Sequence, residues 1–296
     1  MLRLMLGHHP RFSRCGEMEY LTEVLSRRGA LETADLAQET LEANRVFRSD
    51  RLHFNTDIPV RTALTDLVAQ IGARDDATVI GATVHNGFEH LADLWPDARF
   101  IFLHRDPRDV ARSSVRMGWA GNAWAGSEIW LRAQRSLQKL RTRIQPEQLI
   151  ELRFEELVAE PEAELSRICK HLDESFDPSM LAIDEDTTYA RPSASLAKSW
   201  RDDATDVEIA QIEAAIGPQR IREAGYQLSQ VAPMSMNAVI RAQLSVENRL
   251  GRFRFRLNRY GTLLTLRSAI AKRSGIASWR RSTQRSIDEV DIRHLK

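Results

Sequence analysis

Residues 100–113 read FIFLHRDPRDVARS, and this stretch predicts a buried strand that passes directly into a helix. Its first five residues form an apolar run typical of an interior strand. Asp106 suits the N-cap of the following helix, and Pro107 suits the first helical position. A helix N-terminus offers unpaired N–H groups to an anion. The junction therefore predicts an anion-binding turn, with the side chains of Arg105 and Ser113 beside it.

Short apolar runs alternate with helical patterns along the chain, which indicates an α/β fold with a mostly parallel sheet. Residues 184–204 are rich in Asp, Ser, Thr and Ala and predict a long functional loop. The predicted strands cover residues 2–7, 78–84, 100–104 and 149–153. The predicted helices cover residues 17–28, 34–47, 59–71, 127–143, 161–172 and 206–216.

The composition is that of a globular protein: 296 residues, 43% of them apolar and 28% charged. Such a chain has room for one large domain or two small ones. The chain has 14 glycines, too few for a collagen-like chain. Its two cysteines, Cys15 and Cys169, are too few for a disulfide scaffold. The apolar run at residues 4–6 is shorter than a signal-peptide core, and no uncharged run approaches the roughly 18 residues that span a bilayer. We therefore expect a cytoplasmic protein.

Charge is unevenly distributed, although 42 Lys and Arg nearly balance 41 Asp and Glu. Residues 231–296 hold 14 basic and 4 acidic residues, which leaves 28 and 37 for residues 1–230. This difference predicts two domains, 1–230 and 231–296, the second a basic amphipathic helical extension. We expect the extension to pack on the acidic body. Contact with a second copy or with a membrane surface is the alternative, and nucleic acid is not an expected partner.

The stretch at 100–113 resembles the 3′-phosphate-binding segment of sulfotransferases that use 3′-phosphoadenosine 5′-phosphosulfate (PAPS). Arg105 and Ser113 match the two phosphate-binding positions of that segment. Residues 94–99, 149–157, 199–201 and 224–226 are similar to further family segments, in the same order. The resemblance covers about residues 1–228. It implies a three-layer α/β/α fold of the P-loop NTPase-like sulfotransferase type, PAPS as the donor, and nucleotide contacts from Lys198 and Trp200. The implied acceptor is a hydroxyl of a carbohydrate, a glycolipid or a small metabolite.

Residues 7–21, GHHPRFSRCGEMEYL, depart from the Arg-Ser-Gly-Thr-Thr loop with which the family binds the 5′-phosphosulfate. One alignment places Arg14, Cys15 and Gly16 on the Arg-Ser-Gly positions, so that Glu17 and Met18 replace both threonines. A second alignment uses Arg11 with Ser13 as the hydroxyl donor. Either one leaves an arginine and a glycine at a turn where main-chain N–H groups could bind a phosphate.

Two alternative functions remain open, one suggested by the departure of this loop from the family pattern and one by the basic extension. One is a non-catalytic nucleotide- or partner-binding protein on the same fold. The other places the function in the basic extension, as a membrane-surface or nucleic-acid module. Neither a G-x-x-x-x-G-K-[ST] loop nor a G-x-G-x-x-G fingerprint occurs, so the sequence does not favour a nucleotide triphosphatase or a dinucleotide-binding enzyme.

Sulfuryl transfer requires a base for the acceptor hydroxyl and positive charge for the leaving phosphate. We expect His85, which follows the apolar run at 78–84, to be the base, because a neutral imidazole suits that task near pH 7. We expect Arg14 to supply the charge. No metal-ligand motif occurs, so no metal is expected. Four other residues remain as alternative bases: the carboxylates Glu17, Glu19 and Asp57, and the histidine His53.

Overall fold

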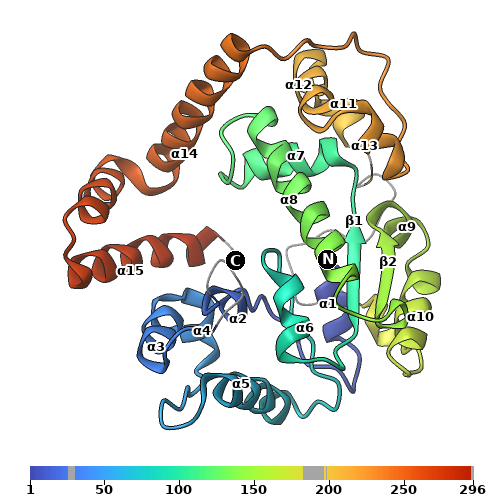
Figure 1. Cartoon of the computed structure of the whole chain (residues 1–296), viewed down its shortest axis with the longest axis vertical. Coiled ribbons are helices and arrows are strands. Elements are labelled where there is room, and N and C mark those ends of the chain that lie inside the picture. The colour runs from blue at the N-terminus through green and yellow to red at the C-terminus, as the bar shows by residue number, and fades with distance from the viewer. Residues whose placement is uncertain (26–30, 183–196, 198, 295–296) are drawn as a thin grey trace. The chain divides into compact units, whose positions relative to one another are not determined.

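A computed structural model describes residues 1–25, 31–182, 197 and 199–294 of the chain. The contacts within it group the chain into two compact units. The first unit consists of Met1–His104 and Arg135–Ala194, and the second of Arg105–Gln134 and Ser195–Lys296. Figure 1 labels the elements. Those of the first unit are α1 (Leu2–Gly7), α2 (Tyr20–Glu23), α3 (Ala34–Ala43), α4 (Arg45–Asp50), α5 (Val60–Asp75), η1 (Phe88–His90), α6 (Leu91–Leu94), β1 (Phe100–His104), η2 (Pro146–Gln148), β2 (Leu149–Arg153), α9 (Phe154–Ala159), α10 (Pro161–His171) and η3 (Pro178–Leu181). Those of the second are α7 (Pro107–Arg116), α11 (Trp200–Asp203), α12 (Asp206–Ile216), α13 (Pro218–Glu223), α14 (Ala238–Arg273) and α15 (Ala277–His294), while α8 (Ala123–Arg141) runs from the second unit into the first.

Strands β1 and β2 form the parallel sheet of the first unit and have the bounds that the sequence predicted (Figure 1). They pair in register, from Phe100 with Leu149 to His104 with Arg153. Apolar side chains from both strands contact buried residues of neighbouring helices, which explains why these strands read as nearly continuous apolar runs. The α/β class with a parallel sheet and a helical C-terminal segment is thereby confirmed.

The prediction of a continuous strand over residues 78–84 is wrong. Isolated parallel bridges at Val79 and Thr83 occur in its place. Between them the N–H of Gly81 donates to the hydroxyl of Ser13 at 2.9 Å. A side chain thus takes the place that a main-chain carbonyl holds in a regular ladder, and the strand is interrupted there.

The strand predicted at residues 2–7 is also wrong, because this segment is helix α1. Its sequence, LRLMLG, contains good helix formers and no β-branched residue. A short apolar run cannot by itself distinguish a buried strand from a buried helix. Burial of Met5 and Leu6 against the first unit's core, next to η3, decides in favour of the helix.

Several predicted helices have different ends in the structure. The helix predicted over 34–47 divides into α3 and α4 at Asn44, whose side chain accepts the N–H groups of Val46 and Phe47. Of the helix predicted over 17–28, only α2 forms among the described residues, since residues 26–30 lie outside them. The helices predicted over 59–71, 127–143 and 161–172 correspond to α5, α8 and α10, and 206–216 coincides with α12.

The second unit buries apolar side chains of α7, α8, α12 and α13 together, among them Ala111, Trp130 and Ile212. Most of the loop predicted over 184–204 lies outside the described residues, and its end is not a loop, because Trp200–Asp203 forms helix α11. The contacts of the second unit also include α14 and α15. The predicted domain division at residue 230 does not coincide with this grouping and stays a prediction.

Candidate active site

Residues 11–19 run parallel to residues 78–86 in the first unit. Five main-chain hydrogen bonds join the two segments, among them Ser13 N–H to Val79 O at 2.9 Å, Thr83 N–H to Gly16 O at 2.8 Å, and Met18 N–H to Thr83 O at 2.9 Å. Because the segments are parallel, their carboxyl ends lie at the same edge. That edge is where ligands bind in open α/β sheets.

The turn at residues 15–17 has unused hydrogen-bond donors. Among the described residues, no acceptor bonds the main-chain N–H groups of Cys15, Gly16 and Glu17. Cys15 has a left-handed φ of 48°, and a left-handed residue within a turn is a component of anion-binding nests. A Cβ placed on Gly16 would meet no atom within 4 Å, so the main chain borders open space. These donors fit an anion such as a phosphate or a phosphosulfate.

Arg14 precedes this turn, and its side chain is available to a ligand. Its side chain is 83% exposed, and its Nε lies 3.8 Å from Asp75 Oδ1. The main-chain N–H of Arg14 donates to Asp75 Oδ2 at 3.0 Å, which anchors the backbone immediately before the turn. Glu17, on the other side, has its carboxylate 3.8 Å from Arg3 Nε. That pairing offsets part of the negative charge that Glu17 places near an incoming anion.

The residues of the second alignment have structural contacts instead. The hydroxyl of Ser13 is fully buried and bonds the main chain of Gly81. Arg11 donates from Nε to Thr78 Oγ1 at 3.0 Å and pairs with Glu174 at 3.0 Å. The thiol of Cys15 is buried too, and burial raises its pKa to about 11. Arg14 and Gly16 are therefore better placed for a phosphate than Arg11 and Ser13.

His85 lies at the edge where the two parallel segments end, opposite Glu19. Its main-chain N–H and that of Asn86 each donate to the Glu19 carboxylate at 2.9 Å, and Nδ1 of His85 lies 3.5 Å from the same carboxylate. The hydrogen bond to Glu19 raises the pKa of His85, against the opposing effect of burial. Burial alone would raise the pKa of Glu19, but hydrogen bonds from His85 and Asn86 lower it. The His85 side chain is 54% exposed and so remains accessible to an acceptor.

Glu19 was expected only as a substitute base, and its role as the partner of His85 was not predicted. The two are 66 residues apart, so no local pattern signals the contact. His53 and Asp57, two further candidates for the base, lie between α4 and α5. There the main-chain N–H and carbonyl of His53 both bond the side chain of Gln70.

The strand-to-helix turn predicted at 105–107 is present, and it contains a buried ion pair that the sequence did not reveal. Asp106 is the N-cap of α7 and accepts the N–H of Arg108 at 2.9 Å. The guanidinium of Arg108, only 2% exposed, donates to Asp106 at 2.8 and 2.9 Å and to Glu213 of α12 at 2.9 Å. Arg108 thus ties the N-terminus of α7 to α12.

Trp200 belongs to the same buried network. Its indole N–H donates to Asp106 at 3.0 Å, and the Arg108 guanidinium lies 3.8 Å from the centre of its ring. Asp109 accepts the N–H of Trp200 and the hydroxyl of Ser199 at 2.8 and 2.9 Å. The structure therefore gives Trp200 a packing role, and its predicted contact with nucleotide stays a prediction. Lys198 lies outside the described residues.

Arg105 and Ser113 lie at the two places predicted for them, immediately before the N-cap of α7 and on the helix itself. The carbonyl of Arg105 accepts the indole N–H of Trp130 at 3.2 Å, which holds the turn against α8. Both residues belong to the second unit, together with Trp200, whereas residues 11–16 and His85 belong to the first. The predicted site residues thus form two groups, one in each unit.

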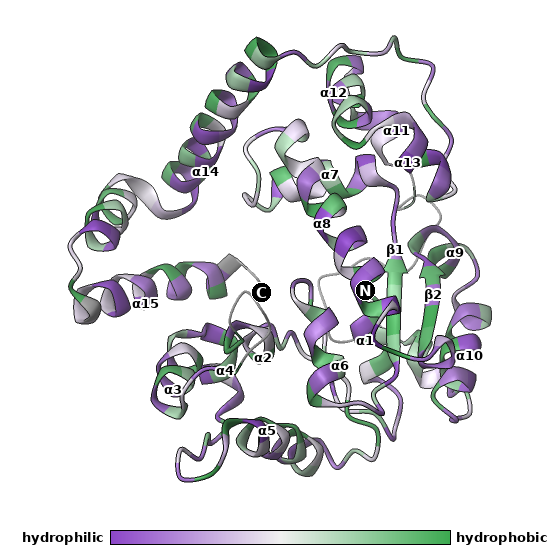
Figure 2. Ribbon diagram, viewed as in Figure 1, coloured by the Kyte–Doolittle hydropathy of each residue, from purple (hydrophilic) through white to green (hydrophobic). Residues whose placement is uncertain are grey.

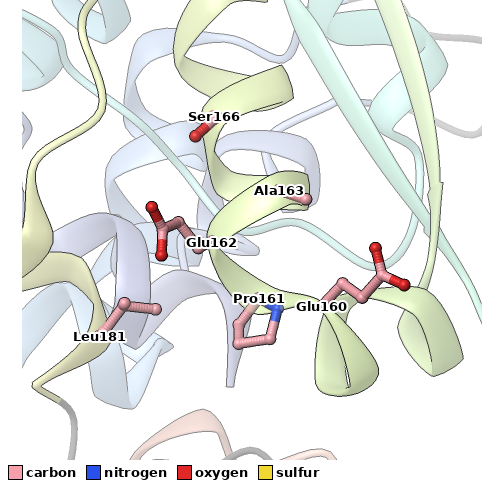
Figure 3. Close-up of a pocket in the computed structure, with 6 residues that line it drawn as sticks. All are labelled: Glu160, Pro161, Glu162, Ala163, Ser166 and Leu181. Atoms are coloured by element: carbon pink, nitrogen blue, oxygen red, sulfur yellow. The ribbon is translucent and has the colours of Figure 1, made fainter.

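Two surface hollows are lined by other residues than these. One, of about 530 Å³, is at the start of α10, and Figure 3 shows the Glu160 and Glu162 carboxylates at its border pointing away from one another. Its acidic border does not suit an anionic donor. The other, of about 570 Å³, is lined by residues of α8, α12 and α14 in the second unit, including Trp124 and Arg241. Within the described part of the chain, no group of three or more His, Cys, Asp or Glu side chains could hold a metal ion.

A family model described as "Sulfotransferase family" matches residues 1–178. Among solved structures, the sulfotransferase domain from the Synechococcus PCC 7002 olefin synthase is similar, with a TM-score of 0.57, 20% identity, and coverage of 77% of this chain and 90% of that one. The sulfotransferase domain from the curacin biosynthetic pathway gives a TM-score of 0.52, 17% identity, and coverage of 77% and 93%. At these identities the likeness shows a shared fold. No curated protein sequence matches the chain.

Proposed function

The chain belongs to the sulfotransferase family, and from that premise we propose that it transfers a sulfuryl group from PAPS to a hydroxyl of a carbohydrate, a glycolipid or a small metabolite. The observation that carries the proposal is the turn at residues 15–17. There, unused N–H donors border open space at Gly16, on a segment whose end is hydrogen-bonded to the base candidate His85.

The hydrogen-bond donors of this turn suit the 5′-phosphosulfate. Main-chain N–H groups of Cys15, Gly16 and Glu17 replace the threonine hydroxyls that the loop lacks, and Arg14 adds a full positive charge. Backbone donors held in place by neighbouring hydrogen bonds need no reorganisation when negative charge develops on the leaving phosphate. In the second unit, we assign Arg105 and Ser113 to the 3′-phosphate.

His85 and Glu19 would act together in the transfer. The acceptor oxygen attacks sulfur, the bond from sulfur to the phosphate oxygen breaks, and the electron pair of that bond stays on the phosphate. His85 takes the proton of the acceptor hydroxyl, and the Glu19 carboxylate stabilises the imidazolium that forms. Arg14 and the N–H groups of the turn stabilise the phosphate that leaves.

Donor recognition can be tested by calorimetry with adenosine 3′,5′-bisphosphate. We expect Arg105→Ala to weaken binding by roughly tenfold to a hundredfold, because one charge-assisted contact with phosphate is lost. Arg116→Ala is the matched control, since Arg116 is exposed near the other end of the same helix. Absence of binding by the intact protein, or equal binding by both variants, contradicts the proposal.

Transfer itself can be tested with sulfate-labelled PAPS and a mixture of glycans, glycolipids and small alcohols. We expect His85→Gln to reduce transfer by about 10²–10⁴-fold while leaving nucleotide binding intact. Gly16→Pro, which removes one N–H donor, should instead weaken nucleotide binding. Nucleotide binding with no transfer to any acceptor would favour a non-catalytic protein on the same fold.

A further inference from the structure

One face of the first part of α14 packs within the second unit. Asn248 accepts the N–H of Gly121 at 2.7 Å, and the carbonyl of Leu244 accepts a side-chain N–H of Asn122 at 2.8 Å. Leu244 is 3% exposed, and a Cβ on Gly251 would lie 2.2 Å from the carbonyl oxygen of Gly121. This inner face therefore makes close contact with the segment between α7 and α8.

The opposite face of the same part of α14 exposes a stripe of large apolar side chains. Val239, Val246, Leu250 and Phe253 are 75%, 54%, 51% and 46% exposed. Their spacings of seven, four and three residues place them on one side of the helix. Figure 2 shows hydrophobic and hydrophilic residues alternating along α14. We expected apolar side chains at such spacing to pack on the body, and these four do not.

A second stripe follows Gly261, where a φ of 73° interrupts the helix. Leu263, Leu266 and Ile270 are 87%, 49% and 56% exposed. On this part of α14, Thr265, Ser268 and Ala271 are buried instead, and α14 packs against α15. Both parts of α14 thus use one face for packing and leave an apolar face to solvent.

Positive charge borders the first stripe. Arg249 and Arg256 lie four residues before and three residues after Phe253, and Arg254 lies four residues after Leu250, so all three flank the stripe. Glu247 is the only acidic residue between positions 238 and 273. The described residues include no carboxylate within 4.0 Å of the guanidinium groups of the three arginines. Their charge is therefore available to an external anion.

We propose that the outer face of α14 binds the surface of an anionic lipid bilayer. The apolar stripes enter the boundary between headgroups and acyl chains, and the flanking arginines contact lipid phosphates. No helix among the described residues is long and apolar enough to cross a membrane. The proposal does not depend on the reaction proposed above.

Two other occupants of this face fit the observations less well. A second copy would bring two extensions of the same sign together, each with 14 basic and 4 acidic residues in 231–296, so the pairing would be repulsive. Nucleic acid would satisfy the arginines but not seven apolar side chains that are about half or more exposed. An anionic bilayer supplies an apolar layer and negative charge in the same surface.

Flotation of the full-length protein with lipid vesicles tests the proposal. We expect binding to phosphatidylcholine vesicles that contain phosphatidylglycerol, much weaker binding to phosphatidylcholine alone, and partial release between about 0.1 M and about 1 M salt. The triple variant Val246→Gln, Leu250→Gln, Phe253→Gln should bind the anionic vesicles at least about tenfold less tightly. Each of Arg249→Gln, Arg254→Gln and Arg256→Gln should lower affinity by about fivefold.

Leu36→Gln with Val207→Gln is the matched control, since both residues are exposed apolar side chains outside the extension, 47% and 57% accessible. This control should bind vesicles like the unchanged protein, and thermal unfolding should show that all variants fold. Absence of vesicle binding, or equal loss in the control and the triple variant, overturns the proposal. So does binding of duplex DNA without vesicles, or a dimer in light scattering that the triple variant converts to a monomer without vesicle binding.

Discussion

The main-chain N–H of His85 donates to Glu19 Oε2 at 2.9 Å, and the same carboxylate lies 3.5 Å from His85 Nδ1. One carboxylate thus positions the backbone of the base candidate and stabilises its protonated ring. In the proposed reaction this arrangement makes His85 a stronger base, because its conjugate acid is stabilised where it forms. It also means that His85 must lose its proton at a higher pH before it can act.

The first prediction concerns the titration of this pair. Glu19→Gln should lower the pKa of His85 toward its ordinary value, because Gln keeps the acceptor but removes the charge. NMR titration of the His85 ring measures the shift, with His53 as an internal control. The acid limb of the pH–rate profile for transfer should move to lower pH in the variant. An unchanged His85 titration would contradict the assigned role of Glu19.

The same pair makes stability depend on pH. The raised pKa of His85 means that its contribution is fully present below about pH 6.5 and is lost as pH rises through the folded-state value. The lowered pKa of Glu19 means that its contribution is present above about pH 4.3 and is lost as pH falls through the folded-state value. Urea unfolding should therefore show the largest difference between the protein and Glu19→Gln at intermediate pH, about 4.5 to 6.5.

The second prediction concerns Arg108. Arg108→Ala should lower the free energy of unfolding by about 3–5 kcal/mol, because it leaves the buried Asp106 carboxylate without its cation. Urea denaturation measures this loss. Arg280→Ala, at an exposed position, should change stability by less than about 0.5 kcal/mol. Equal effects of the two substitutions would show that the buried pair does not stabilise α7.

The third prediction concerns the contact between two glycines. Gly121→Ala and Gly251→Ala would place Cβ atoms 2.1 Å from Asn248 O and 2.2 Å from Gly121 O. Backbone must move to admit them, so each should destabilise the contact by about 1–3 kcal/mol and speed hydrogen exchange in residues 238–260. Gly16→Ala is the control, because its Cβ would meet no atom within 4 Å. Unchanged exchange in Gly121→Ala and Gly251→Ala would contradict the close packing of α14.

The fourth prediction concerns the cysteines. Both thiols are free and buried, and burial raises the pKa of Cys15 to about 11 and that of Cys169 above its usual value. The folded protein should therefore react very slowly with Ellman's reagent near pH 8, whereas the protein in guanidinium chloride should react rapidly at both. Fast reaction at Cys15 in the folded variant Cys169→Ala would show that the turn at residues 15–17 opens, since Cys15 lies within it.

Local signals predicted much of the fold correctly. Three elements have the predicted bounds: the strands at 100–104 and 149–153 and the helix at 206–216. Each has a clear apolar pattern along the sequence, and a local cap or turn marks where that pattern ends. Thr205, for example, forms a capping box with Glu208 at the start of α12. The failures at 2–7 and 78–84 are short apolar runs, whose conformation depends on what they pack against.

The candidate site was predicted in part. The turn before α7, its Asp106 cap and the glycine-containing loop at 14–16 follow from residue types and spacing. The pairing of Glu19 with His85 and the network of Asp106, Arg108 and Trp200 join residues far apart in sequence. Such contacts leave no periodic pattern along the chain, so the sequence did not reveal that Trp200 donates to the buried Asp106 carboxylate.

The sequence by itself determined the α/β class, the strand-to-helix turn with Arg105, the family resemblance and the basic character of residues 231–296, because these depend on local hydrogen bonding, capping and composition. Only the tertiary structure decided that Cys15, Gly16 and Glu17 keep unused N–H donors and that Ser13 is buried. It also decided that α14 exposes one apolar face. The physical reason is that burial and hydrogen-bond pairing depend on which distant segments meet, and the spacing of residues along a chain does not specify that.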